Sequence, residues 1–329
     1  MIRLSARGAH AVFEPGSGHL PELTIDGASV LWAAPWRDDP AVQSDAAIPW
    51  VDRRLGGSFV CAPFGRDDAD GGPPHGLAAN APWRVTRAGP SALTARRRLS
   101  RGRVEARLAL RDGHPALYQT HLLELDAPCS FAHHPVIHLS GGGRIRCSPK
   151  RAALTFDADE GAAFPRAART EDYRFDGRDL RDYPAAPCED FVALVEAAPG
   201  LAWTALERVA EADTILILKR AEQLPLTCLW ISNGARQVAP WLGQTGILGI
   251  EDAACAGADG FAAALSGDTR LAAEGVPLVL PPGRHLIPHA ILRLAGRHEI
   301  TSVTPGDGVL HLATTAGARE VPFAPEHFA

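Results

Sequence analysis

Residues 103–111 read Arg-Val-Glu-Ala-Arg-Leu-Ala-Leu-Arg, and this stretch shows most clearly the pattern that recurs through the chain. Apolar and charged side chains alternate along it: Val104, Ala106, Leu108 and Leu110 are apolar, and Arg103, Glu105, Arg107 and Arg111 are charged. A period of two places successive side chains on opposite faces of an extended backbone. The stretch therefore predicts a β-strand with one buried face and one wet face.

Short runs of this kind recur through most of the chain, and turn residues separate them. The other runs are 58–64, 117–125, 132–139, 191–196, 214–219, 227–232, 247–251, 289–294 and 309–314. The 32 Gly and 27 Pro residues lie largely between them. Many short strands with frequent turns are typical of an all-β sandwich or barrel. Because the pattern continues without a break, residues 1–329 are predicted to form a single domain.

Few helices are expected. One short helix is predicted within residues 257–274, where Phe261, Leu265 and Leu271 form an apolar side. Residues 66–74 are acidic and rich in Gly and Pro, and residues 163–187 have no sustained periodicity. Both stretches predict exposed loops.

Composition excludes several classes of protein. A hydrophobic content of 46% and a charged content of 22% are ordinary for a globular chain, and a net charge of −5 gives no general affinity for nucleic acid. The run Arg96-Arg97-Arg98 lies in an alternating stretch and predicts a solvated strand face. The start of the chain has no apolar signal region, and no run has the roughly 18 apolar residues of a membrane span. The six scattered Cys residues predict reduced, buried thiols and a cytoplasmic protein.

His75 lies in the first stretch with chemical potential. A Gly pair, Gly56-Gly57, precedes the strand-like run 58–64, and the loop after this run leads to Pro74-His75-Gly76. A Gly directly after a His lets backbone or ligand approach closely. Taken alone, a His-Gly pair of this kind favours a loop-capping residue over a site residue.

His134 lies in the second stretch, Phe131-Ala132-His133-His134-Pro135, which continues to His138. In a strand His134 and His138 share one face and His133 takes the other. No metal-ligand spacing of a known kind is present, so no metal site is predicted. Partly buried structural roles are the simple interpretation of His133 and His138.

Glu251 ends the third stretch, Gly246-Ile247-Leu248-Gly249-Ile250-Glu251, which follows Trp230 and Trp241 along the chain. A carboxylate at the end of an apolar strand is costly to bury unless it has a partner or a use. The alternative is that Glu251 and Asp252 simply begin a loop in solvent.

Taken together and in order, these stretches resemble the aldose 1-epimerase (galactose mutarotase-like) superfamily, nearest the hexose-6-phosphate mutarotase branch. The resemblance extends to the turn Pro282-Gly283. It implies a large antiparallel β-sandwich of the galactose mutarotase type and no cofactor. It also implies an isomerase, an aldose 1-epimerase, that interconverts the α and β anomers of a sugar. Under it His134 protonates the ring oxygen, Glu251 takes the proton of the anomeric hydroxyl, and His75 holds or polarises the sugar.

Three further residues are predicted to bind the sugar: Trp230 as an aromatic platform, and Arg66 and Asn80 as polar contacts. The arginines that the phosphate-binding branch carries are displaced or missing, since Leu55 follows Arg54 and Ala79 stands where an Arg is usual. A phosphate needs fixed cations. A free aldose or an acidic sugar is therefore the expected ligand, bound by a monomer or a homodimer.

Two other functions stay open. The residues after His134 and Glu251 differ from the family pattern, which favours a non-catalytic carbohydrate-binding or sensor protein on the same scaffold. A lyase or hydrolase would need a second acidic partner near Glu251, and Asp252 is the adjacent candidate.

Overall fold

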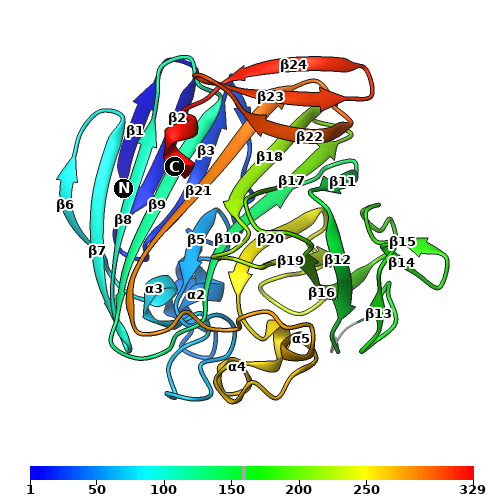
Figure 1. Cartoon of the computed structure of the whole chain (residues 1–329). Coiled ribbons are helices and arrows are strands. Elements are labelled where there is room, and N and C mark those ends of the chain that lie inside the picture. The colour runs from blue at the N-terminus through cyan, green and yellow to red at the C-terminus, as the bar shows by residue number, and fades with distance from the viewer. Residues whose placement is uncertain (158–160) are drawn as a thin grey trace.

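Two large antiparallel sheets face each other in the computed structural model, which describes residues 1–157 and 161–329 (Figure 1). The first, called here the large sheet, has eleven strands. Its strands, in spatial order, are β1 (Ile2–Ala6), β2 (Ala9–Glu14), β3 (His19–Ile25), β5 (Ser58–Cys61), β10 (Phe131–His138), β20 (Ile247–Ala254), β19 (Leu226–Asn233), β16 (Cys188–Glu196), β12 (Lys150–Thr155) and β13 (Arg169–Thr170), with β4 (Ala28–Ser29) beside β3.

The second sheet has eight strands and packs against the large sheet. In spatial order they are β11 (Gly143–Cys147), β17 (Leu201–Arg208), β18 (Asp213–Arg220), β21 (Gly283–Ala295), β9 (Ala116–Leu125), β8 (Gly102–Leu110), β7 (Ala92–Leu99) and β6 (Arg84–Ala88). A single apolar cluster fills the space between the two sheets, with Leu4 and Phe131 from the large sheet and Leu108 and Leu123 from the second. The predicted all-β sandwich is confirmed.

A third layer covers the far side of the second sheet. It consists of β22 (Ile300–Pro305), β23 (Val309–Thr314) and β24 (Gly317–Pro322), which lie across the top of Figure 1. Leu310 and Leu312 pack there against Leu216 and Leu292 in a separate apolar cluster. This is why β18 and β21 are apolar on both faces and show no clean alternation.

The predicted strand of residues 103–111 is β8, and its four apolar residues are all buried. Glu105, predicted on the wet face, is only 7% exposed. Arg96 of β7 and Arg107 of β8 both pair with it, which compensates its charge. Arg96 and Arg98 thus lie on the exposed face of β7, where Arg96 makes a surface ion pair with Glu105.

Helices are short and lie in the connections: α1 (Pro40–Ser44), α2 (Trp50–Arg53), α3 (Gly76–Asn80), α4 (Phe261–Ser266), α5 (Arg270–Ala273) and the 3₁₀ turns η1 (Gly257–Asp259) and η2 (Pro325–Phe328). The single helix predicted within residues 257–274 is in fact η1, α4 and α5. Gly267, in the left-handed region at φ 72°, ends α4, and the Thr269 side chain caps α5. The predicted loop 163–187 contains β13 and the small hairpin β14 (Arg174–Phe175) and β15 (Arg178–Asp179).

Among the described residues, no helix has the length and apolar character needed to cross a membrane.

Candidate active site

His134 of β10 and Glu251 of β20 lie opposite each other on neighbouring strands. The paired residues on either side, His133 with Asp252 and Val136 with Gly249, set this register. The His134 Nε2 and Glu251 Oε1 atoms are 3.1 Å apart. Both residues are nearly buried, at 3% and 1% exposure. Two residues that lie 117 positions apart in sequence thus come into direct contact.

Strand alternation decides which way these side chains point. His134 and Glu251 point to the outer face of the large sheet, the face turned away from the second sheet, where His75, Phe59 and Trp230 surround His134. His133 points inward and stacks on His289 of the second sheet, with ring centroids 4.1 Å apart. In the part of the chain that the structure describes, no group of three or more His, Cys, Asp or Glu side chains is arranged to hold a metal ion.

His75 reaches the pair from the loop that precedes α3. Its ring lies edge-on to that of His134, with centroids 5.3 Å apart. Its backbone is left-handed at φ 63°, a conformation that non-glycine residues rarely adopt. The backbone N–H of His75 donates to Gly65 O at 2.7 Å and its carbonyl accepts from Ala62 N at 3.2 Å. These bonds hold the strained residue in place and aim its imidazole at the site.

Gly76 explains why the His is followed by glycine. Its φ is +67°, and a Cβ at this position would lie 2.1 Å from Ala62 O. Only glycine lets the loop approach β5 this closely. The glycine therefore fixes the position of His75 relative to the large sheet.

Phe59 of β5 is a site residue that the sequence did not reveal. It pairs with His134 in the β5–β10 register, and its ring stacks on the imidazole at a centroid distance of 4.3 Å. His19 stacks on the other side of the same ring, at 4.6 Å. Phe59 thereby restricts how the His134 ring can turn. The sequence shows only that Phe59 lies in an apolar run next to Gly56-Gly57.

Trp230 of β19 lies edge-on to His134, with ring centroids 6.1 Å apart, and is partly exposed. Its Nε1 donates to Glu189 Oε1 at 2.6 Å, and Arg236 pairs with the same carboxylate. The Arg236 guanidinium also lies over Trp241, 4.6 Å from the ring centroid. Burial raises the pKa of Glu189, while the neighbouring Arg236 opposes this shift. Glu189 gave no signal in the sequence, because it stands among ordinary strand residues.

Gly249 lies in close contact with Glu251 and Trp230. A Cβ there would lie 2.8 Å from Glu251 Oε1 and 3.2 Å from the Trp230 side chain. Any larger residue would displace the Glu251 carboxylate or the indole of Trp230. A residue without a side chain thus separates the carboxylate from the aromatic ring.

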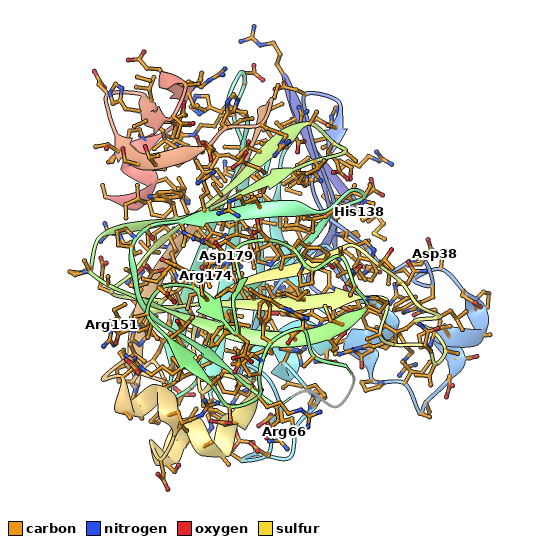
Figure 2. All side chains as sticks on the ribbon, turned by 90° about the vertical axis from the view of Figure 1, so that its right-hand side faces the viewer. Asp38, Arg66, His138, Arg151, Arg174 and Asp179 are labelled. Carbon is orange, nitrogen blue, oxygen red and sulfur yellow. The ribbon has the colours of Figure 1, made fainter. Side chains whose placement is uncertain are left out.

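The structure does not join Asn80 and Arg66 to this group. The Asn80 amide donates to Pro74 O at 2.6 Å and to Gly76 O at 2.7 Å, and its oxygen accepts from Val51 N at 3.0 Å. These bonds occupy the side chain and tie α3 to α2, so Asn80 supports the loop that carries His75 instead of facing a ligand. Arg66 is exposed and donates to Asp259 O at 3.1 Å (Figure 2 labels it at the lower edge of the molecule). The predicted roles of Asn80 and Arg66 as sugar ligands are therefore not carried forward.

The electrostatics of the pair follow from its burial. Burial raises the pKa of Glu251 well above its ordinary value, with Cys255 adding to the rise. Burial and, after it, the neighbouring His75 lower the pKa of His134 well below its ordinary value. Burial also lowers the pKa of His75 to about 4. The site thus favours the uncharged forms of both side chains, a protonated Glu251 and a neutral His134.

Two atoms of the pair have no partner within the described chain: His134 Nδ1 and Glu251 Oε2. A buried polar atom without a hydrogen bond is costly, and such atoms concentrate at functional sites. One is a nitrogen and the other a carboxyl oxygen, and both belong to titratable groups. The arrangement can therefore accept and donate protons to an oxygen-rich ligand.

Solved structures with the same fold are aldose 1-epimerase and galactose mutarotase-like proteins. A protein of Escherichia coli K12 provisionally described as an aldose 1-epimerase has a TM-score of 0.62 and 15% identity, over 89% of this chain and 98% of that one. The GalM/aldose epimerase homologue from C. elegans has a TM-score of 0.59 and 13% identity, over 90% and 99%. A galactose mutarotase related enzyme from Lactobacillus acidophilus has a TM-score of 0.58 and 13% identity, over 90% and 97%. The chain therefore has the galactose mutarotase-like fold.

No protein-family model and no curated protein matches the chain.

Proposed function

We propose that the protein is an aldose 1-epimerase, which interconverts the α and β anomers of an aldose by acid–base ring opening. The observation that carries the proposal is the direct contact of His134 Nε2 with Glu251 Oε1, at 3.1 Å on the outer face of a mutarotase-like sandwich. A base and an acid in one small site are what the reaction requires, since one proton leaves the anomeric hydroxyl and another reaches the ring oxygen.

In the proposed reaction Glu251 takes the proton of the anomeric hydroxyl. The bond between C1 and the ring oxygen then breaks, its electron pair goes to that oxygen, and the imidazolium of His134 protonates it. Rotation about the C1–C2 bond presents the other face of the aldehyde, and reclosure runs both transfers backwards. Each positioned proton transfer contributes about 10²–10⁴-fold. His75, neutral because burial lowers its pKa to about 4, is placed to hydrogen-bond the sugar beside His134.

One proton shared by the pair suits this scheme. With the proton on Glu251 both groups are neutral, and with it on His134 the pair is an acid and a base ready to react. The raised pKa of Glu251 and the lowered pKa of His134 both favour a pair that holds one proton in total. The expected rate profile is therefore bell-shaped in pH, because gaining or losing a proton inactivates the pair.

The charges near the pair support an uncharged aldose as substrate. Arg236, the cation that contacts Trp230, already pairs with Glu189. Arg54, which is displaced from the position of the phosphate-branch arginine, shares the carboxylate of Glu14 with Arg37. Both arginines thus already have a carboxylate partner. A phosphorylated or acidic sugar would have to compete with Glu189 and Glu14 for these two cations.

The test is to follow the anomer interconversion of free and phosphorylated aldoses by polarimetry or exchange NMR. The purified protein is expected to accelerate it for at least one free aldose, and Glu251→Gln and His134→Gln to lower kcat by at least about 10²-fold. Glu124→Gln, which removes an exposed partner of Arg103, is the matched control and should leave the rate unchanged.

The wild type failing to accelerate any of these sugars would refute the proposal. Sugar binding without acceleration would establish the carbohydrate-binding alternative. Faster turnover of a sugar phosphate than of the free sugar would refute the substrate class alone.

A further inference from the structure

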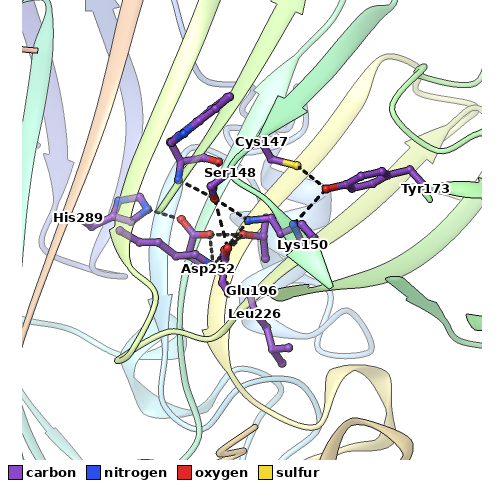
Figure 3. A network of polar contacts seen from close by, with 11 residues as sticks. Cys147, Ser148, Lys150, Tyr173, Glu196, Leu226, Asp252 and His289 are labelled. Atoms are coloured by element: carbon purple, nitrogen blue, oxygen red, sulfur yellow. Dashed lines mark hydrogen bonds and ion pairs between the residues drawn. The ribbon is translucent and has the colours of Figure 1, made fainter. Parts of the chain in front are cut away.

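A network of buried charges lies on the inner face of the large sheet, directly behind the site (Figure 3). Lys219 of β18 reaches across from the second sheet, and its Nζ lies 3.1 Å from Asp252 Oδ1 and 2.9 Å from Glu196 Oε1. It also donates to Thr227 Oγ1 at 2.8 Å. On the same face, Glu196 pairs with Lys150. The network therefore joins the two sheets of the sandwich.

The charges of this network cancel. Lys150 and Lys219 are the only lysines of the chain, and their side chains are each 1% exposed. Glu196 and Asp252 supply two negative charges, with side chains 4% and 2% exposed. Burying four charges is favourable only when each is paired and hydrogen-bonded. Every member here meets that condition, so removal of one leaves a net charge in a dry interior.

The network is next to the catalytic pair along the chain. Asp252 follows Glu251, and His133 precedes His134, so that each strand carries a site residue outward and a network residue inward. Asp252 lies opposite His133 on β10 and opposite Thr227 on β19. Its Oδ1 accepts from Thr227 Oγ1 at 2.8 Å, and its Oδ2 lies 3.1 Å from His289 Nε2. Asp252 thus ties β20 to β19 and to the second sheet at the point where Glu251 emerges.

We propose that Asp252 and Lys219 are positioning residues of the site: they hold β20 in the register that places Glu251 against His134, and their cancelling charges set the pH range in which this pair works. The shifts of the rate profile that this proposal predicts rest on the proposed function, because they require turnover. The role of Asp252 in this proposal is not catalytic, because the Asp252 carboxylate faces away from the sugar site. The proposal also explains why both lysines of an Arg-rich chain are buried here.

The charged and titratable groups around the network come from every element packed on it. In and around the network they are Lys150, Glu196, Lys219, Asp252, His133, His289, His121, His327, Cys147 and Tyr173, and on the outer face around the pair they are His19, His75, Cys61, Cys228 and Cys255. Burial lowers the pKa of His121 to about 3 and lowers that of His133 well below its ordinary value. These two imidazoles are neutral at working pH and add no charge. The lysines and the carboxylates therefore decide the net charge behind the pair.

Opposite changes in this charge should move the pH profile in opposite directions. Asp252→Asn leaves one positive charge in excess, which favours the carboxylate of Glu251 and disfavours the imidazolium of His134. Both limbs of the rate profile should then move to lower pH by about one unit, the effect of a unit charge roughly 10 Å away at an effective dielectric constant near 20. Lys219→Met leaves one negative charge in excess, so both limbs should move to higher pH.

The double variant Asp252→Asn/Lys219→Met removes one charge of each sign. We expect it to fold and to regain the wild-type pH profile to within a few tenths of a unit. Asp213→Asn is the matched control, because Asp213 is also a buried carboxylate between two cations, Arg208 and Arg293, but does not adjoin the pair. It should lower stability and leave the pH profile unmoved.

The imidazole nitrogens of His134, titrated by NMR in the same variants, give a readout that needs no turnover. Opposite shifts of this titration in the two single variants support the proposal, even if the wild type proves inactive and the proposed function falls. The proposal would be overturned if the two single variants shifted the titration in the same direction or not at all. It would also be overturned if the double variant failed to fold or failed to restore the wild-type titration. KM should change little in each variant, since the network does not touch the sugar.

Discussion

At the scale of single residues, the site depends on two side chains with opposite shifts in pKa. Burial destabilises the charged form of both, raising the pKa of Glu251 and lowering that of His134. Neither group is poised for proton transfer alone. They are in contact at 3.1 Å, so under the proposed function the pair, and not either residue alone, carries the proton transfers.

Glycines set the space in which these residues act, and Gly76 offers a sharp test at the residue scale. Gly76→Ala is expected to lower the free energy of unfolding by more than about 2 kcal/mol, because the new Cβ would lie 2.1 Å from Ala62 O in addition to the strain of a positive φ. Urea unfolding measures this change.

Gly71→Ala is the control for Gly76→Ala. Gly71 has nearly the same φ, +69°, but a Cβ there meets nothing within 4 Å. Its cost should be limited to the backbone strain, roughly 1 kcal/mol. Equal destabilisation by the two substitutions would show that the close approach of the His75 loop to β5 has no energetic importance.

At the scale of elements, the site is a row across neighbouring strands, supported by loops from elsewhere in the chain. Phe59, His134 and Glu251 stand on β5, β10 and β20 in one register. The segment that carries α1 and α2, residues 33–55, forms a lobe beside this row, and Asp38 marks it in Figure 2. Its position depends on one carboxylate of β2, that of Glu14, which pairs with Arg37 and Arg54.

Glu14→Gln tests how that lobe is held. The Arg37 side chain is 7% exposed and its Nη2 lies 2.6 Å from Glu14 Oε2, so the substitution leaves a buried cation without its partner. We expect a loss of about 3–5 kcal/mol in the free energy of unfolding. Glu124→Gln removes a carboxylate from an exposed pair with Arg103 and should cost less than about 1 kcal/mol. Similar losses in both variants would contradict a special role for the buried pair.

At the scale of the whole molecule, the sandwich buries imidazoles as neutral groups. Burial lowers the pKa of His121 to about 3 and that of His75 to about 4, and it lowers the pKa of His133 as well. In the unfolded chain these imidazoles bind a proton below about pH 6.5. The folded protein cannot bind these protons until the pH falls to the lowered values. The stability that the neutral imidazoles contribute is therefore fully present above about pH 6.5. It is lost as the pH falls from there towards the lowered pKa values of the folded protein.

Acid lability is the expected result, and His121 allows it to be measured. The free energy of unfolding, from urea titrations at pH 7, 6 and 5, should fall with decreasing pH. His121→Phe keeps a flat ring beside Phe131 and His133 but removes one proton site. For this variant, the slope of the free energy of unfolding against pH near pH 5 should be smaller than that of the wild type by about 1.4 kcal/mol per pH unit. This is the value for one proton. Identical slopes would mean that His121 is charged in the folded protein.

The sequence predicted the fold to a large extent, since its strand signals are local. The run 103–111 became β8, and the runs at 132–139 and 247–251 became the two strands that carry the pair. His75, His134 and Glu251 were identified through a resemblance in order and spacing, and the structure brings them together with Trp230. Phe59 and Glu189 were missed, because a ring that stacks on an imidazole and a carboxylate that meets an indole leave no pattern of their own.

By itself the amino-acid sequence determined the strands, because a two-residue period and the placement of Gly and Pro act within a few residues of backbone. It also determined that His133 and His134 point to opposite faces. Only the tertiary structure decided that His134 lies opposite Glu251, that Lys219 meets Asp252, and that Asn80 ties two helices together. Those facts depend on register between distant strands and on burial from water, and both arise only when the two sheets pack.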